Sequence, residues 1–364
     1  MVKEAINFIS QPQYSFTLAM VLFFLGCKYY RFVGSKKFGL WTLVLSVGFY
    51  IWAILDPTFA LIIFFPDNVP ISILLATVGF FTWFSMHKAA ENDARLERGE
   101  PPIEGTPENR EKVWCWPNLV YTEMFTIILG TVFLIAWAIV FKAPLEEPAN
   151  PTWAPNPAKA PWYFLGLQEM LVYFDPWLAG VVLPVLIIVG LVAIPYIDTN
   201  PKGNGYYCWE DRKLAIIAFN YGWLVLWLFL IIIGTFLRGP NWTFYGPFEY
   251  WDSHKVVAEY NVNLSELLWI KFLNMRMPSN ILLRESLGIA VTFFYLFGFI
   301  PLLKKCSLTI RQKMHDLYTE LGFIRYYLLL LLVLGTASLP IKMYLRWLFT
   351  LKYIVALPEW ELNI

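Results

Sequence analysis

A polar, aromatic segment lies between two strongly apolar stretches of this 364-residue chain. Residues 156–171 read Asn-Pro-Ala-Lys-Ala-Pro-Trp-Tyr-Phe-Leu-Gly-Leu-Gln-Glu-Met-Leu. Proline restricts the backbone of a loop, and aromatic side chains offer flat apolar walls to a ligand. Glu169 follows Trp162 by seven residues, which is two helical turns, so their side chains share one helix face. Glu169, and Asp175 shortly after it, are the carboxylates here that could transfer a proton.

The elements that position this segment are membrane helices. Hydrophobic residues make up 58% of the chain and charged residues 15%, and several apolar runs approach or exceed the roughly 20 residues needed to cross a bilayer. Lipid offers no partners to backbone polar groups, and the period-2 alternation of barrel strands is absent, so these runs must be helices. The sequence predicts an all-α integral membrane protein. Eight spans are expected, at about residues 14–31, 39–55, 70–86, 118–141, 176–197, 213–237, 286–303 and 326–345.

Lys and Arg are divided unevenly between the two alternating sets of loops. One set, which includes Arg110 and Lys202, holds 17 of the 28 basic residues. Basic residues accumulate on the cytoplasmic side of membrane proteins. We therefore expect both termini and the Trp162 segment on the outer side, in a bacterial cytoplasmic membrane.

The chain divides into four regions. Residues 1–86 carry three spans, and the charged, turn-rich residues 87–111 are typical of a solvated inner linker. Residues 112–240 carry three more spans and the outer proline-rich loop. Residues 241–364 hold a long outer segment and two spans. In that outer segment, the apolar pattern between Leu264 and Met275 predicts an amphipathic interfacial helix anchored by Trp269. Residues 238–242 predict a helix end with a sharp turn.

Histidine and cysteine give little sign of a metal centre on this chain. Membrane haems need pairs of imidazoles on facing helices, but His87, His254 and His315 are predicted at different depths. Each is interpreted as a surface or interfacial histidine, with a metal or haem at a subunit boundary as the alternative for His87. The four cysteines form no Cys-x-x-Cys pattern, so free thiols are expected and a metal site is not. The net charge of +1 gives no reason to expect a nucleic-acid partner.

The middle of the chain resembles the C-terminal portion of cytochrome b in Rieske/cytochrome b quinol oxidoreductases, a portion that is the separate subunit IV of the photosynthetic version. In that family an outer loop carries Pro-Glu-Trp-Tyr, followed by a short helix that lines the quinol-oxidation pocket. The matching positions here are Ala160, Pro161, Trp162 and Tyr163, flanked by Trp116, Pro117 and Asn118 before one span and by Asp175, Pro176 and Trp177 before the next.

This resemblance implies a quinol site with one altered residue. The family's motif glutamate, which is proposed to accept a quinol proton, aligns with Pro161, which cannot titrate. Glu169 is its expected replacement and Asp175 the runner-up, with an interfacial carboxylate facing water as the alternative for Glu169. A quinol head group has apolar faces and polar edges, although aromatic residues also gather at any membrane interface. The residues expected to bind quinol are Pro161, Trp162, Tyr163, Phe164, Tyr173 and Phe174.

The expected function is that of a membrane subunit of a quinol-oxidising complex, which forms part of the outer quinol site and is not catalytic alone. The resemblance implies quinol as a shared ligand, with b-type haem and an iron-sulfur cluster on partner subunits. The implied partners are a haem-bearing N-terminal cytochrome b subunit, a Rieske iron-sulfur protein, cytochrome c and membrane lipids. Two alternatives are a structural anchor for a redox partner and a translocating subunit that uses Asp56, Glu123, Glu169 and Asp175.

Overall fold

The computed structural model describes residues 1–109, 112–141, 148–152, 154–200, 206–258 and 260–364. The α-helices are, in chain order, α1 (Val2–Ile9), α2 (Pro12–Lys28), α3 (Tyr30–Val33), α4 (Lys36–Ile54), α5 (Pro57–Ile63), α6 (Asn68–Glu97), α7 (Val120–Val140), α8 (Trp162–Met170), α9 (Leu183–Ile197), α10 (Trp209–Asn220), α11 (Phe229–Ile232), α12 (Leu264–Glu266), α13 (Ile281–Arg284), α14 (Ser286–Phe293), α15 (Phe299–Cys306) and α16 (Leu308–Phe349).

Short segments with tighter or wider helical turns extend several of these helices. They are Cys115–Leu119 before α7, Leu178–Val182 before α9, Tyr221–Leu228 and Ile233–Leu237 on either side of α11, Leu267–Phe272 after α12, and Phe294–Gly298 between α14 and α15. Single 3-10 turns occur at Ile103–Gly105, Pro107–Asn109, Pro240–Trp242 and Pro358–Trp360. The strands β1 (Ala356–Leu357) and β2 (Leu362–Asn363) form an antiparallel hairpin near the C-terminus.

The all-α membrane fold class is confirmed. Among the described residues, seven helices are long and apolar enough to cross a membrane, and the count is eight if α1 and α2, which are bent by 80° relative to each other, form one span. The predicted ends differ most at α6 and α16, which are 30 and 42 residues long. The helix α16 is longer than a bilayer requires because it consists of two helical parts that meet in a bend at Gly322. The φ of Gly322 is 74°, a left-handed conformation that glycine adopts readily.

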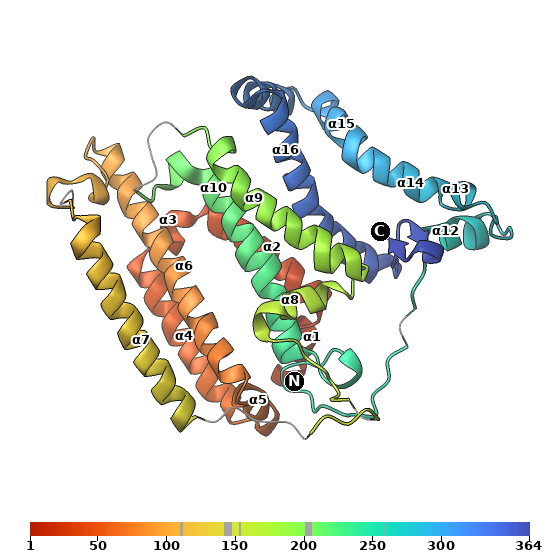
Figure 1. Cartoon of the computed structure of the whole chain (residues 1–364), viewed down its shortest axis with the longest axis horizontal. Coiled ribbons are helices and arrows are strands. Elements are labelled where there is room, and N and C mark those ends of the chain that lie inside the picture. The colour runs from red at the N-terminus through yellow and green to blue at the C-terminus, as the bar shows by residue number, and fades with distance from the viewer. Residues whose placement is uncertain (110–111, 142–147, 153, 201–205, 259) are drawn as a thin grey trace.

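The loops that the charge count assigns to opposite sides lie at opposite ends of the bundle. Figure 1 shows α3, the end of α6, the start of α10 and the joint of α15 with α16 at one end, and the N-terminus, α5 and α8 toward the other. Arg110 and Lys202, which the count includes, lie outside the described residues. The side of the membrane that each end faces stays a prediction.

The second predicted span ends at a turn that begins with Asp56. Its carboxylate accepts hydrogen bonds from the backbone amides of Thr58 and Phe59, at 2.9 and 3.2 Å, and so caps the N-terminus of α5. The Lys3 amine binds the other carboxylate oxygen at 2.6 Å. The hydrogen bond from Lys3, together with these amides, lowers the pKa of Asp56. The N-terminal helix is thus tied to the turn between α4 and α5.

The first part of residues 87–111, predicted as a solvated linker, continues α6 to Glu97. Asn92 and Asp93 are buried there rather than solvated. The Asp93 carboxylate accepts hydrogen bonds from the Tyr30 hydroxyl at 2.8 Å and from the Trp209 backbone amide at 3.1 Å. The polar residues that suggested a linker therefore join α3, α6 and α10, because buried carboxylates and amides need such partners.

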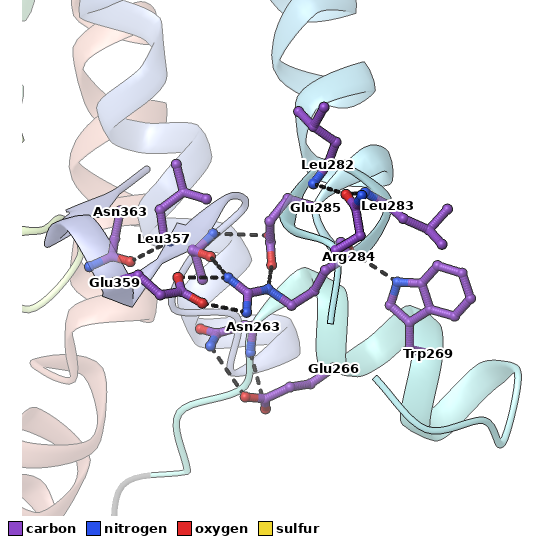
Figure 2. A network of polar contacts seen from close by, with 12 residues as sticks. Asn263, Glu266, Trp269, Leu282, Leu283, Arg284, Glu285, Leu357, Glu359 and Asn363 are labelled. Atoms are coloured by element: carbon purple, nitrogen blue, oxygen red, sulfur yellow. Dashed lines mark hydrogen bonds and ion pairs between the residues drawn. The ribbon is translucent and has the colours of Figure 1, made fainter. Parts of the chain in front are cut away.

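The predicted interfacial segment forms helical turns at 264–272, capped by Asn263 and Glu266. The Trp269 indole donates to the carbonyl of Arg284 at 3.0 Å, so this side chain packs within the chain (Figure 2). Arg284 also binds Glu285 at 3.1 Å and Glu359 at 2.7 Å. The network fixes the C-terminal hairpin against the start of α14, since the Glu285 carboxylate also accepts from the Ala356 backbone amide at 3.0 Å.

Candidate functional site

The short helix α8 begins at Trp162, as the resemblance predicts. Its buried side chains include Leu165 and Met170, each 2% exposed. Leu165 lies so close to Gly234 that a Cβ atom at Gly234 would stand 2.9 Å from the Leu165 Cγ. Glycine at this position therefore lets α8 approach the long span that contains α10 and α11 (Figure 1).

The loop before α8 is fastened by Gln168. Its side-chain oxygen accepts from the Ala160 backbone amide at 2.8 Å, and its side-chain nitrogen donates to the Ala158 carbonyl at 2.8 Å. Further out, the Asn241 backbone amide donates to the Asn156 side chain at 2.6 Å, which in turn donates to the Asn241 side chain at 2.9 Å. Ala158 and Ala160 of the loop are thus bound to α8, and Asn156 is bound to the turn that follows the long span.

Glu169 forms a buried ion pair with Arg238. The two carboxylate oxygens accept from the Arg238 Nη2 at 2.6 Å and Nε at 2.9 Å, and the third guanidinium nitrogen donates to the Trp242 carbonyl at 2.9 Å. The Glu169 side chain is fully buried and that of Arg238 is 7% exposed. Such a paired arrangement is strong and directional. It holds α8 against the end of the long span.

Lys159 lies beside this ion pair. Its amine donates to the Thr235 carbonyl at 2.7 Å and stands 4.9 Å from the centre of the Trp251 ring. Burial disfavours its charged form and lowers its pKa from 10.5 to about 8; Glu169 opposes this effect and Arg238 adds to it. Lys159 thus places an amine with a lowered pKa next to a buried carboxylate.

Replacing Lys159 by methionine should change how stability depends on pH. An unfolded lysine titrates near pH 10.4, so between pH 8 and that value the unfolded state binds more protons than the folded state. As the pH rises through this window, the free energy of unfolding of the wild-type protein should therefore increase by up to about 3 kcal/mol relative to that of Lys159→Met. Below pH 8 the difference between the two proteins should not change with pH. Thermal unfolding in detergent at several pH values measures this difference. A pH-independent difference would show that Lys159 keeps its ordinary pKa.

The aromatic residues predicted to bind quinol fall into two groups. Trp162, Tyr163 and Phe164 are 40, 50 and 52% exposed, and Pro161 before them is exposed as well. Tyr173 and Phe174 are 1 and 6% exposed and belong to the main apolar core, where Tyr173 packs edge-on against Trp347 of α16. Only the first group presents open aromatic surface. The second supports the turn after α8 from beneath.

Asp175 is held by the C-terminal hairpin. One carboxylate oxygen accepts from the Asn363 side chain at 2.8 Å, and the Asn363 carbonyl accepts from the Trp177 indole at 3.1 Å. The side chain of Asp175 lies next to Tyr353, where burial and then this carboxylate raise the pKa of the tyrosine hydroxyl. Asp175 is 9% exposed. Unlike Glu169, it has no cationic partner among the described residues.

The three histidines lie far apart in the fold. The His87 ring stacks on Trp83 and its Nδ1 lies 2.7 Å from the Gly34 carbonyl, whereas His254 is exposed and His315 belongs to the first part of α16. Cys27 and Cys115 are free thiols, Cys208 is buried, and the Cys306 side chain lies outside the described part. Within the described ranges, no group of three or more His, Cys, Asp or Glu side chains could hold a metal ion.

Sequence reasoning missed four residues that build this region. Arg238, Lys159, Gln168 and Asn363 each contact α8, its loop or Asp175. Residues 238–242 do form the predicted turn, with positive φ at Asn241 and Trp242. The only available signal for Arg238 was its position at the end of a span, on the same predicted side as Glu169.

The comparison with known protein families bears on this region. Residues 148–248 match the family described as cytochrome b(C-terminal)/b6/petD. This part of the chain is therefore cytochrome b C-terminal-like, as the resemblance predicts. The match contains α8, Glu169 and Arg238 but not α7, which the resemblance includes. No solved structure gave a significant match to the chain.

Proposed function

We propose that this chain is a membrane subunit of a quinol-oxidising electron-transfer complex and that α8 forms one wall of its quinol site. The observation that carries this proposal is the position of α8 within the part that matches the cytochrome b family. There a buried ion pair fixes the helix, and Trp162, Tyr163 and Phe164 remain open to a ligand. Preorganised aromatic walls with few polar groups suit a flat head group.

In this proposal the exposed aromatic residues contact the quinol ring, and Pro161 shapes the approach to it. Tyr173 and Phe174 support that wall from the core. Quinol oxidation releases two electrons and two protons, so the site needs a proton acceptor. We assign this role first to Asp175, because Arg238 occupies both oxygens of Glu169. Glu169 is then a positioning residue, and it could accept a proton only if the ion pair opened.

The redox centres of the proposed complex belong to other subunits. A haem-bearing cytochrome b subunit takes one electron, and a Rieske iron-sulfur protein passes the other to cytochrome c. The quinol site faces the outer side of a bacterial cytoplasmic membrane, with both termini on that side. The chain contributes binding surface and a proton acceptor and does not catalyse quinol oxidation alone.

Purification of the intact assembly in mild detergent tests this function. Haem-bearing and iron-sulfur subunits should copurify, and adding quinol should change the optical spectrum of the b-type haem. Trp162→Ala should raise the KM for quinol about fivefold, since stacking against an aromatic ring contributes about 1 kcal/mol. Trp360→Ala is the matched control, because Trp360 is an exposed tryptophan in the C-terminal hairpin. An assembly without redox subunits would contradict the proposal.

A further inference from the structure

A cavity of about 780 Å³ lies where α15 meets α16, far from α8. The bend of α16 at Gly322 separates its first part, residues 308–321, from the long part that crosses the bundle. In Figure 1 the first part turns away from the long part at one end of the molecule. The cavity lies inside this bend, at the end of the membrane-spanning helices that carries Lys304 and Lys305.

The charged side chains that line this cavity belong to basic residues. Lys304, Arg311 and His315 line it, and no Asp or Glu is among the described residues that do so. Neither Lys304 nor Arg311 forms an ion pair within the described part of the chain. The Lys304 amine lies 5.3 Å from the centre of the Tyr326 ring, which helps to hold this charge at the cavity wall.

Tyr326 brings a second, independent feature. The residue is 1% exposed, lines the cavity, and its hydroxyl is buried without a hydrogen-bond partner among the described residues. A buried hydroxyl normally finds a partner, because leaving it unpaired costs about 1–3 kcal/mol. A ligand oxygen in the cavity would supply that partner.

Two other residues that line the cavity are aromatic and exposed. Phe323 and Tyr327 line it and are 65 and 52% exposed, on the part of α16 that begins to cross the bundle. The centres of their two rings are 4.8 Å apart. Basic side chains and exposed aromatic rings in one cavity together match a ligand with an anionic head and an apolar tail.

We propose that this cavity binds the phosphate head group of an anionic phospholipid. Lys304 and Arg311 pair with the phosphate, the Tyr326 hydroxyl donates to a phosphate oxygen, and the acyl chains run along Phe323 and Tyr327. Basic pockets between membrane helices are suited to such head groups. A lipid fits better than free phosphate because the aromatic side of the cavity would otherwise face no ligand atoms.

The test measures lipid retention by the purified protein with its copurifying subunits. The assembly is placed in nanodiscs of phosphatidylcholine with a minor fraction of phosphatidylglycerol, and native mass spectrometry counts the bound lipids. The wild type should retain phosphatidylglycerol in preference to phosphatidylcholine. The double variant Lys304→Gln/Arg311→Gln should lose about fivefold in affinity for each charge removed.

The matched control is Lys305→Gln/Lys313→Gln, which removes the same charge from neighbouring residues that do not line the cavity. It should lose far less affinity. Tyr326→Phe deletes only the hydroxyl and should weaken phosphatidylglycerol binding even if the double variant does not fold. Equal losses in the two double variants, or unchanged binding in Tyr326→Phe, would overturn the site. Competition by inorganic phosphate at lipid-equivalent concentration would overturn the assignment to a lipid.

Discussion

Replacing Arg238 by methionine should lower the free energy of unfolding by about 3–5 kcal/mol, because it leaves the Glu169 carboxylate buried without a counter-charge. Glu169 is fully buried, and in the native protein Arg238 binds both of its oxygens. The side chain of methionine fills similar space but cannot donate a hydrogen bond. Since the ion pair joins α8 to the end of the long span, the loss should appear in that region first. Chemical or thermal unfolding in detergent measures the effect.

Two further variants separate the charge effect from a packing effect. In Glu169→Gln/Arg238→Met the uncompensated charge is gone, so this double variant should be more stable than Arg238→Met alone. Arg98→Met makes the same substitution in an exposed ion pair with Glu100 and should change the free energy of unfolding little. If Arg238→Met is as stable as Arg98→Met, the buried pair contributes nothing to the fold.

The helical architecture was readable from sequence because lipid imposes a simple rule. Apolar runs of sufficient length must form helices, and the expected spans correspond to apolar helices in the structure. Residues 87–97 were misjudged because charged residues at a membrane edge resemble a solvated linker. The burial of Asp93 in this stretch depends on Tyr30 and Trp209, which sequence reasoning could not place beside it.

The site was predictable only in its local part. The short helix after Pro161 follows from spacing and resemblance, and α8 begins at Trp162. The partner of Glu169 is 69 residues away along the chain, and the partner of Asp175 is 188 residues away. Pairings between distant helices depend on the packing of the whole bundle. The sequence therefore identified both carboxylates but not the cation that neutralises one of them.

Because Arg238 pairs with Glu169 but not with Asp175, the amide variants of these two carboxylates should lose turnover to different extents. Asp175→Asn should reduce quinol-driven turnover of the assembled complex about a hundredfold, the lower end of the usual contribution of a positioned general base. The amide keeps an oxygen that can accept from Asn363, so the fold should survive. Glu169→Gln should lower stability, yet the turnover of each correctly assembled complex should fall only a few-fold, because Glu169 acts through the position of α8.

The pH profile of turnover distinguishes proton acceptance from positioning. A carboxylate that accepts a proton must be ionised, so wild-type turnover should fall toward acid pH. Asp175→Asn should lose this acid limb, whereas Glu169→Gln should keep it. Normalising turnover to the haem content of each preparation removes differences in assembly. The reverse pattern, with the acid limb lost only in Glu169→Gln, would mean that the ion pair with Arg238 opens during turnover and that Glu169 receives the proton.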